Sequence, residues 1–181
     1  TTALKFCNRE LKKSNVEVKL FVGDQHFIAC QPSAMIQVFV NVILNACDAL
    51  KHKADALHRS IEISTQEHSD SLSICIKDDG AGISEAALKQ IMDPFVSSNN
   101  SSENMGLGLS ICQTIMRHHQ GAIKISSELN SWTEVELILP AQINVTQAKM
   151  IKKNSVDTAE LFIKQNNDQI PSKQIHASDD I

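Results

Sequence analysis

Three features are missing from this sequence, and each excludes a kind of protein. Its five cysteines are odd in number and form no Cys-x-x-Cys pair, so we expect buried free thiols in a reducing compartment. Lys and Arg form no basic stripe and the net charge is −4, which argues against nucleic-acid binding. No apolar run approaches the roughly 18 residues that span a bilayer, and no signal peptide opens the chain. We therefore expect these residues to be soluble and cytoplasmic.

The 181 residues, 42% of them hydrophobic, suit one globular domain with a real core and some spare sequence. We expect a partly helical lead-in over 1–15, a folded domain over 16–140, and a polar, partly disordered linker or tail over 141–181. The chain starts without Met, so we interpret it as an excised part of a longer protein.

Alternating apolar residues and turn signals predict a mixture of strands and helices. The longest helix is expected over Ala34–Leu50 with Ser33 as its N-cap. A short helix is expected over Ser84–Met92, capped by Ser84, and another opens near Gly106 and closes at Gly121. Strands are expected at 16–22, 26–30, 60–65, 71–77, 122–127 and 133–139.

The longest predicted helix carries an unusual polar row. Gln37, Asn41, Asn45 and Asp48 fall on one narrow stripe, opposite a broad apolar face. Asn and Asp are poor helix formers because their short side chains compete for the backbone. The row therefore indicates a face toward a ligand or metal, although a solvated helix face explains it equally well when the helix is considered alone.

Two glycine-rich turns complete the pattern. Asp78-x-Gly80-x-Gly82 follows a predicted strand, and Gly106-x-Gly108 opens a predicted helix after the polar loop 97–104. Each turn is common by itself and needs no function, but their order and spacing relative to the polar row are specific.

Together these segments resemble the ATP-binding catalytic domain of two-component sensor histidine kinases, over about 16–140. That superfamily also includes type II topoisomerase ATPase subunits, mismatch-repair ATPases and ninety-kilodalton heat-shock chaperones. NVILNACDAL resembles the family's N box, DDGAGI its G1 box, DPF its F box, MGLGLSIC its G2 box, and WTEVELILP its closing G3 strand. The resemblance implies an α/β fold, a two-layer sandwich in which a mixed sheet packs against three helices.

The resemblance also implies a site for ATP and Mg²⁺. Asp78 would accept a hydrogen bond from the purine amine, with Thr133 adding a water-mediated contact. Gly80 and Gly82 would let the backbone approach the flat ring. Asn45 would bind Mg²⁺, flanked by other members of the row. The nucleotide-binding residues implied are Asn41, Asn45, Asp48, Asp78, Gly80, Gly82, Ile83, Phe95, Gly106, Leu107, Gly108, Leu109 and Thr133.

The phosphates would bind at the helix that opens at Gly106 and Gly108, because a helix N-terminus presents free backbone N–H groups. No GxxxxGK[ST] pattern occurs, so this is not a Walker-type loop. Relatives that hydrolyse ATP carry Glu four residues before the Mg²⁺ asparagine, but this chain has Asn41 there, which cannot act as a base. The resemblance therefore favours phosphoryl transfer to a histidine over hydrolysis.

None of the seven histidines is followed by an acidic residue, unlike the family's acceptor motif, and we interpret His118 and His119 as structural. The implied partners are a histidine-bearing dimerisation domain and a response regulator. No catalytic residue is assigned, and the isolated domain is expected to be monomeric. The longer parent can be anchored in the inner membrane.

The lid departs from the family pattern. Ser97-Ser98-Asn99 replaces a Thr-Thr-Lys, so the lysine that reaches the γ-phosphate is missing, and Arg117 is a candidate to compensate for it. Further departures are Asn104, Gln120 and the Ser131-Trp132 pair, all where glycines are usual. These departures keep open a second hypothesis, a degenerate, non-catalytic nucleotide-binding or interaction module of the same fold. A third, an ATPase of the topoisomerase or mismatch-repair type, is disfavoured by Asn41.

Overall fold

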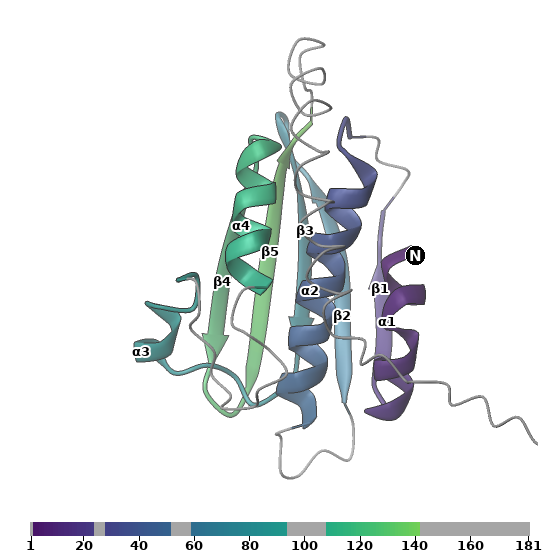
Figure 1. The fold of residues 1–181 in the computed structure, drawn as a ribbon, viewed down its shortest axis with the longest axis vertical. Coiled ribbons are helices and arrows are strands. Elements are labelled where there is room, and N and C mark those ends of the chain that lie inside the picture. Colours follow the sequence, from purple (N-terminus) through teal and green to yellow (C-terminus); the bar gives the residue numbers. More distant parts are fainter. Residues whose placement is uncertain (1, 24–27, 52–58, 94–107, 142–181) are drawn as a thin grey trace, which may run out of the picture.

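A computed structural model describes residues 2–23, 28–51, 59–93 and 108–141. Five strands form one sheet in the order β1-β2-β3-β5-β4, and α1, α2 and α4 lie side by side on one face of it (Figure 1). This arrangement confirms the predicted two-layer α/β fold. In chain order the elements are α1 (Thr2–Lys13), β1 (Glu17–Phe21), α2 (Pro32–Lys51), β2 (Ser60–Glu67), β3 (Ser71–Asp78), α3 (Glu85–Leu88), α4 (Gly108–His118), β4 (Ala122–Glu128) and β5 (Trp132–Pro140).

The sheet is mixed, as expected. β1 pairs parallel with β2, whereas the β2–β3, β3–β5 and β4–β5 pairs are antiparallel. The register places Asp78 opposite Ile61 on one side and Thr133 on the other. Because directly opposed residues share a face of the sheet, Asp78 and Thr133 point toward the helices with the buried Ile61.

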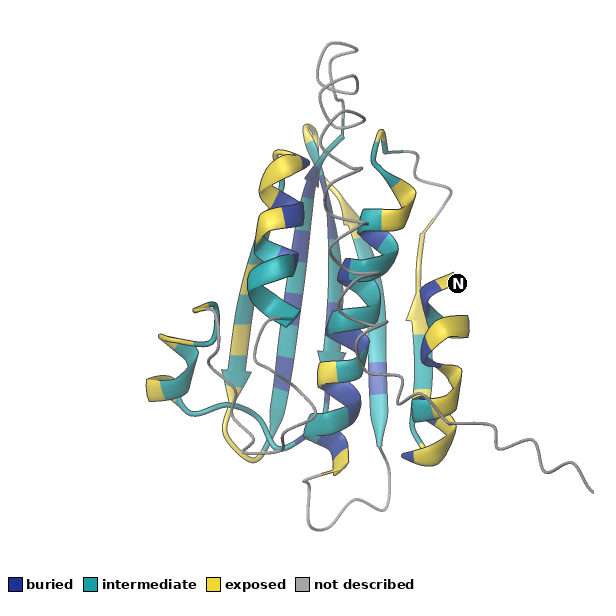
Figure 2. Ribbon diagram, in the orientation of Figure 1, coloured by how far each residue is buried: buried dark blue, intermediate teal, exposed yellow. Residues whose placement is uncertain are grey.

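Helix α2 is the centre of the core, packing against α1, α4 and β3. Its buried residues are Met35, Val38, Val42, Ile43, Ala46, Cys47 and Leu50 (Figure 2). The expectation that no apolar stretch approaches the length of a membrane span was wrong, because α2 is long and apolar enough by length and composition. Its apolar side chains are nevertheless used in packing against the sheet and the two flanking helices.

Helix α1 belongs to the same core. Ala3, Cys7 and Leu11 are buried on its inner face, so the lead-in packs into the domain. At its C-terminal end Arg59 Nη1 donates to the Ser14 carbonyl at 3.0 Å. Residues 2–13, predicted to be a lead-in, therefore pack against the rest of the domain in one continuous core.

Several helix ends differ from the predictions. Pro32 is the first residue of α2, so Ser33 lies inside the first turn and is not its N-cap; proline suits that position because no N–H is needed there. Ser84 does cap α3, accepting from Ala87 N at 3.3 Å. That helix ends at Leu88, not Met92, because the following bonds, such as Gln90 N to Ala87 O, close tighter turns.

The end of α4 is a Schellman motif. Gln120 takes the left-handed conformation (φ 56°), and Gly121 N donates to Met116 O at 2.8 Å. Gly121 follows the end of the helix, as predicted, and a Cβ there would collide with the Ile138 carbonyl. The predicted strand at 26–30 is also wrong where it is described, since 28–30 form no strand, and 24–27 lie outside the described residues.

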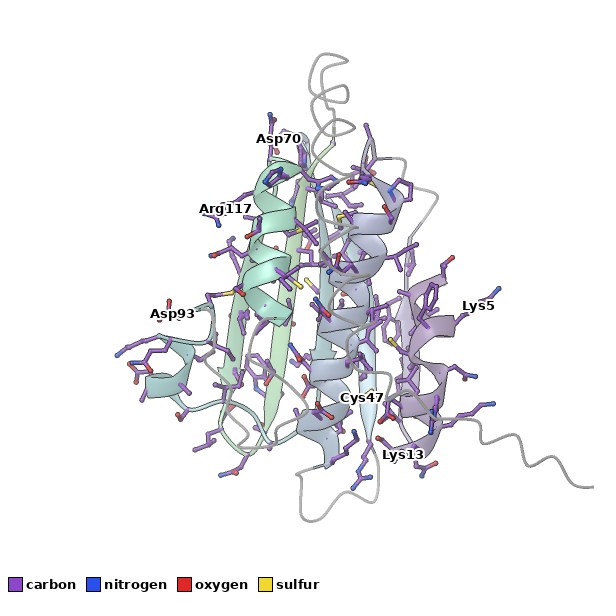
Figure 3. The ribbon with its side chains drawn as sticks, in the orientation of Figure 1. Lys5, Lys13, Cys47, Asp70, Asp93 and Arg117 are labelled. Atoms are coloured by element: carbon purple, nitrogen blue, oxygen red, sulfur yellow. The ribbon has the colours of Figure 1, made fainter. Side chains whose placement is uncertain are left out.

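The prediction of buried free thiols is confirmed for Cys7, Cys47 and Cys112, whereas the free thiols of Cys30 and Cys75 are only half-buried. Burial raises the pKa of Cys47 to about 12 and that of Cys112 to about 11. Figure 3 labels Cys47 on α2. These thiols stay protonated at neutral pH and act as small apolar side chains.

His119 joins the C-terminal end of α4 to the start of α2. Its Nε2 accepts from Gln31 N at 3.0 Å, so Nδ1 must carry the proton donated to Ile115 O at 2.8 Å. The ring is 1% exposed. His119 is therefore structural, as expected, and joins α4 to the start of α2 through both ring nitrogens.

Replacing His119 by Ala should destabilise the fold by about 2–4 kcal/mol, because a cavity forms and Gln31 N loses its acceptor. Urea unfolding followed by circular dichroism measures the change. His118→Ala is the matched control, since His118 is exposed one residue earlier on the same helix. Equal stability of the two variants would contradict this role for His119.

Candidate functional site

The first part of the candidate site is the carboxylate at the end of β3. Asp78 is 5% exposed, and its Oδ1 accepts from Gly80 N at 2.9 Å. Across the ladder Thr133 is 6% exposed. A carboxylate and a hydroxyl therefore lie next to each other on the helix-facing side of the sheet, where apolar side chains would be expected.

Contacts within the protein explain why the two positions after Asp78 are glycines. A Cβ on Gly80 would lie 2.8 Å from Ala49 Cβ, and Ala81 N donates to Ala49 O at 3.1 Å, so this turn rests directly on α2. Gly82 has φ +64°, and a Cβ there would collide with the Glu128 carbonyl. We expected these glycines to admit a flat ring; the structure shows that close packing of the turn already requires both.

The polar row of α2 is divided among different partners. Asn41 Nδ2 donates to Gly108 O at 3.3 Å and to Cys112 Sγ at 3.7 Å, so it holds the start of α4. Asn45 is exposed one turn later. Asp48 Oδ1 accepts from Lys51 Nζ at 2.8 Å. Of the three, Asn45 is the one whose side chain faces solvent, as a metal ligand would require.

The start of α4 is packed less tightly against the other described residues than the turn after β3 is. A Cβ on Gly108 would come no closer than 3.8 Å to Asn41 Cγ, which is an ordinary contact, and its φ is not left-handed. Among the residues that the structure describes, none lies close enough to Gly108 to require that it lack a side chain, in contrast to Gly80 and Gly82. Leu109 is half-buried beside it. Phe95, Gly106, Leu107 and the loop 97–104 lie outside the described residues, so those predictions stay predictions.

One polar residue was missed by the sequence reasoning. Ser127 Oγ donates to Trp132 O at 2.7 Å, accepts from Ile83 N at 2.8 Å and lies 3.0 Å from Thr133 Oγ1. Ser127 thus connects the turn after β3 to the hydroxyl beside Asp78. The sequence could have indicated this residue, because Ser127 alternates in phase with Ile123 and Ile125 along the strand and must therefore face inward.

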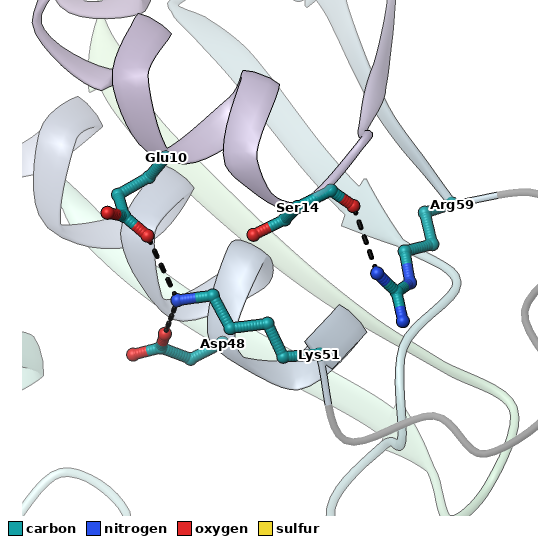
Figure 4. Close-up of polar contacts among 5 residues, drawn as sticks. All are labelled: Glu10, Ser14, Asp48, Lys51 and Arg59. Atoms are coloured by element: carbon teal, nitrogen blue, oxygen red, sulfur yellow. Dashed lines mark hydrogen bonds and ion pairs between the residues drawn. The ribbon is translucent and has the colours of Figure 1, made fainter.

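A second missed group links the polar row to α1. Lys51 Nζ lies 2.8 Å from Asp48 Oδ1 and 3.0 Å from Glu10 Oε2 (Figure 4). The hydrogen bond to Lys51 lowers the pKa of the Glu10 carboxyl, and the bond to Asp48 raises the pKa of Lys51. The side chains are about a third exposed, so water screens the pairs and each contributes little to stability.

No group of three or more His, Cys, Asp or Glu side chains able to hold a metal occurs among the residues that the structure describes. The available donors near α2 are an amide and carboxylates already engaged with Gly80 or Lys51. This set suits a cation that arrives with a ligand and keeps much of its water, which is the behaviour of Mg²⁺.

The Glu10–Lys51 pair predicts a pH window. Because the folded pKa of Glu10 is lowered, its contribution is present above the ordinary carboxyl pKa of about 4.3 and is lost as pH falls further. Because the folded pKa of Lys51 is raised, its contribution is present below about 10.4 and is lost above that.

Glu10→Gln should therefore be less stable than the wild type between these limits and should approach it outside them. Urea unfolding midpoints of both proteins, measured from pH 3 to 11, give this difference in stability. Glu17→Gln on β1 is a control, since Glu17 is an exposed carboxylate. A Glu10→Gln difference that does not change with pH would refute the pairing.

Comparison with known proteins fits this geometry. Residues 30–143 match the family described as "Histidine kinase-, DNA gyrase B-, and HSP90-like ATPase". Sporulation kinase E of Bacillus subtilis (strain 168) is 30% identical over 143 residues, covering 78% of this chain and 19% of that protein. Signal transduction histidine-protein kinase AtoS of Escherichia coli (strain K12) is 37% identical over 105 residues, covering 58% and 16%. The chain thus spans about a fifth or less of either relative's length.

Solved structures show the same fold. The catalytic domain of histidine kinase ThkA has a TM-score of 0.65 at 20% identity, with 77% of this chain and 90% of that one covered. Acinetobacter baumannii histidine kinase AdeS has a TM-score of 0.62 at 20% identity, with 78% and 62% covered. The family match extends from just before α2 to just past the end of β5, and this chain therefore belongs to the histidine kinase-, DNA gyrase B- and HSP90-like ATPase family.

Proposed function

We propose that this chain is the ATP-binding kinase domain of a sensor histidine kinase, which transfers the γ-phosphoryl group of ATP to a histidine on a separate dimerisation domain. The observation that carries the proposal is the state of Asn41. It occupies the position from which a glutamate would activate water, and its amide is engaged with Gly108 O and Cys112 Sγ. An amide held in this way cannot accept the proton of an attacking water.

The adenine would bind against Asp78 and Thr133. Both groups can accept hydrogen bonds, and the exocyclic amine of adenine is a donor. Asp78 accepts from Gly80 N and Thr133 Oγ1 lies 3.0 Å from Ser127 Oγ, and a carboxylate and a hydroxyl oxygen can each accept more than one hydrogen bond. Ile83 and the Gly80–Gly82 turn would border the same end of the purine.

The phosphates would bind at the N-terminal end of α4, because a helix N-terminus presents backbone N–H groups to an anion. The Asn45 amide oxygen would be a ligand of Mg²⁺, with Asn41 and Asp48 placed beside it on the same row. Bound Mg²⁺ supplies charge neutralisation of the phosphates during transfer. The chain's own contribution is to position the nucleotide between β3, α2 and α4.

The similarity to AtoS, a signal transduction histidine-protein kinase, supports a proposal about partners. A sensor kinase needs a histidine-bearing dimerisation domain and passes its phosphoryl group to a response regulator, and we propose both as partners of this chain. We further propose that the domain works in the cytoplasm and is monomeric when isolated.

Asp78→Asn should weaken ATP binding about ten- to a hundredfold, because a charge-assisted hydrogen bond becomes a neutral one with a donor facing a donor. Isothermal titration of the full chain with ATP and Mg²⁺ measures the affinity. Asp79→Asn is the matched control: it removes the same charge one residue later, where Oδ1 accepts from Ser60 N at 2.9 Å.

Wild-type protein that binds no ATP would overturn the proposed site. Equal affinities of the wild type and Asp78→Asn for ATP would show that the purine does not bind at this end of β3. Retained binding in Asp79→Asn is expected, since that carboxylate is engaged with the start of β2 and not with the helix-facing side.

Phosphoryl transfer is tested by adding a histidine-bearing dimerisation domain in trans with γ-labelled ATP. Acid-labile, base-stable labelling of that domain is expected, with little release of phosphate by the chain alone. Asn45→Ala should abolish the labelling. ATP binding without any labelling would support the degenerate-module hypothesis instead, and steady hydrolysis that Asn45→Ala abolishes would support an ATPase.

A further inference from the structure

The hydroxyl of Ser127 has a fixed set of partners, and these decide the orientation of its neighbour. A hydroxyl carries one proton and two lone pairs. Ser127 Oγ lies 2.7 Å from the Trp132 carbonyl, which can only accept, so the serine proton is used there. Ile83 N–H, 2.8 Å away, can only donate and takes one lone pair.

The third contact of Ser127 must therefore run in one direction. Thr133 Oγ1 lies 3.0 Å away, and either oxygen is a possible donor by geometry alone. Since the serine has no second proton, Thr133 is the donor and Ser127 the acceptor. The single proton of Thr133 is then engaged, and the threonine oxygen presents only lone pairs to any other group.

This orientation matters because of what lies across the strand. Thr133 is the register partner of Asp78, and both are almost fully buried on the helix-facing side of the sheet. A carboxylate also presents only lone pairs. Two adjacent acceptors favour a ligand whose facing edge, or whose bridging water, offers hydrogen-bond donors. They repel a ligand whose facing edge offers a carbonyl oxygen.

We propose that Ser127 is a positioning residue for purine specificity: by accepting the Thr133 proton, it makes this part of the pocket an acceptor-only surface that favours a 6-amino purine over a 6-oxo purine. This inference rests on the proposed function of nucleotide binding. Without Ser127 the threonine hydroxyl is free to rotate and donate to a 6-oxo group, so discrimination falls without any loss of a direct ligand contact.

The test compares ATP with ITP, whose base has a carbonyl oxygen in place of the 6-amino group and carries a proton on N1. Their dissociation constants are measured by isothermal titration, with Mg²⁺, for the wild type and Ser127→Ala. The variant should lower the preference for ATP over ITP about threefold to tenfold, the range for one hydrogen bond. Ser126→Ala is the matched control, because Ser126 is exposed on the opposite face of β4 and should leave the preference unchanged.

A double-mutant cycle separates positioning from simple packing. Thr133→Val keeps the shape of the threonine and removes its hydroxyl, so Ser127→Ala should no longer change the ATP preference in that background. If Ser127→Ala weakens ATP and ITP equally, or changes the preference as much in the Thr133→Val background as in the wild type, the inference is wrong. Wild-type protein that binds neither nucleotide would instead refute the proposed function itself.

Thermal unfolding shows whether Ser127→Ala remains folded, since Ile83 N loses its acceptor. Should that variant fail to fold, Thr133→Val alone decides the matter: it removes one of the two acceptors and should reduce the preference by a similar factor. An unchanged preference in Thr133→Val would overturn the inference.

Discussion

The rest of the site depends on one contact, between the turn after β3 and the last turn of α2. Gly80 has no side chain, so the turn can lie against Ala49, and Ala81 N donates to the Ala49 carbonyl. This bond satisfies a carbonyl near the end of a helix, where intrahelical partners run out. It also sets the distance between the Asp78 carboxylate and the exposed face that carries Asn45, so the two ends of the proposed nucleotide site are joined by backbone.

Helix α2 serves both the core and the site, and its neighbours are held to it from both sides. On one side Asn41 bonds to the start of α4 and His119 bonds to Gln31 N ahead of α2. On the other side Lys51 bridges Asp48 and Glu10 of α1. The apolar face of α2 provides the stability that allows three poor helix formers on its polar row, since core burial outweighs small differences in helix propensity.

The sequence predicted well those features that depend on local pattern. The five strands that form the sheet, and α2, α3 and α4, followed from alternation and helical periodicity, whereas α1 was expected only as a partly helical lead-in. The β2–β3 hairpin followed from two alternating strands across a short polar loop. Errors occurred where a neighbour decides the outcome. Residues 28–30 have an apolar pattern but no strand partner, and Ser33 resembles an N-cap although Pro32 already begins the helix.

In the candidate site, too, features set by local sequence were predicted and features set by distant neighbours were missed. Asp78, Gly80 and Asn45 were recognisable because motif spacing along the chain is a local property. Ser127 and Lys51 were missed, because their roles come from contacts with residues 44 and 41 positions away, Ile83 and Glu10 respectively. The sequence by itself determined the family, the order of elements and the residue types of the proposed nucleotide site. Only the tertiary structure decided which hydrogen bonds those residues already make, because the direction of each proton depends on groups brought together by folding.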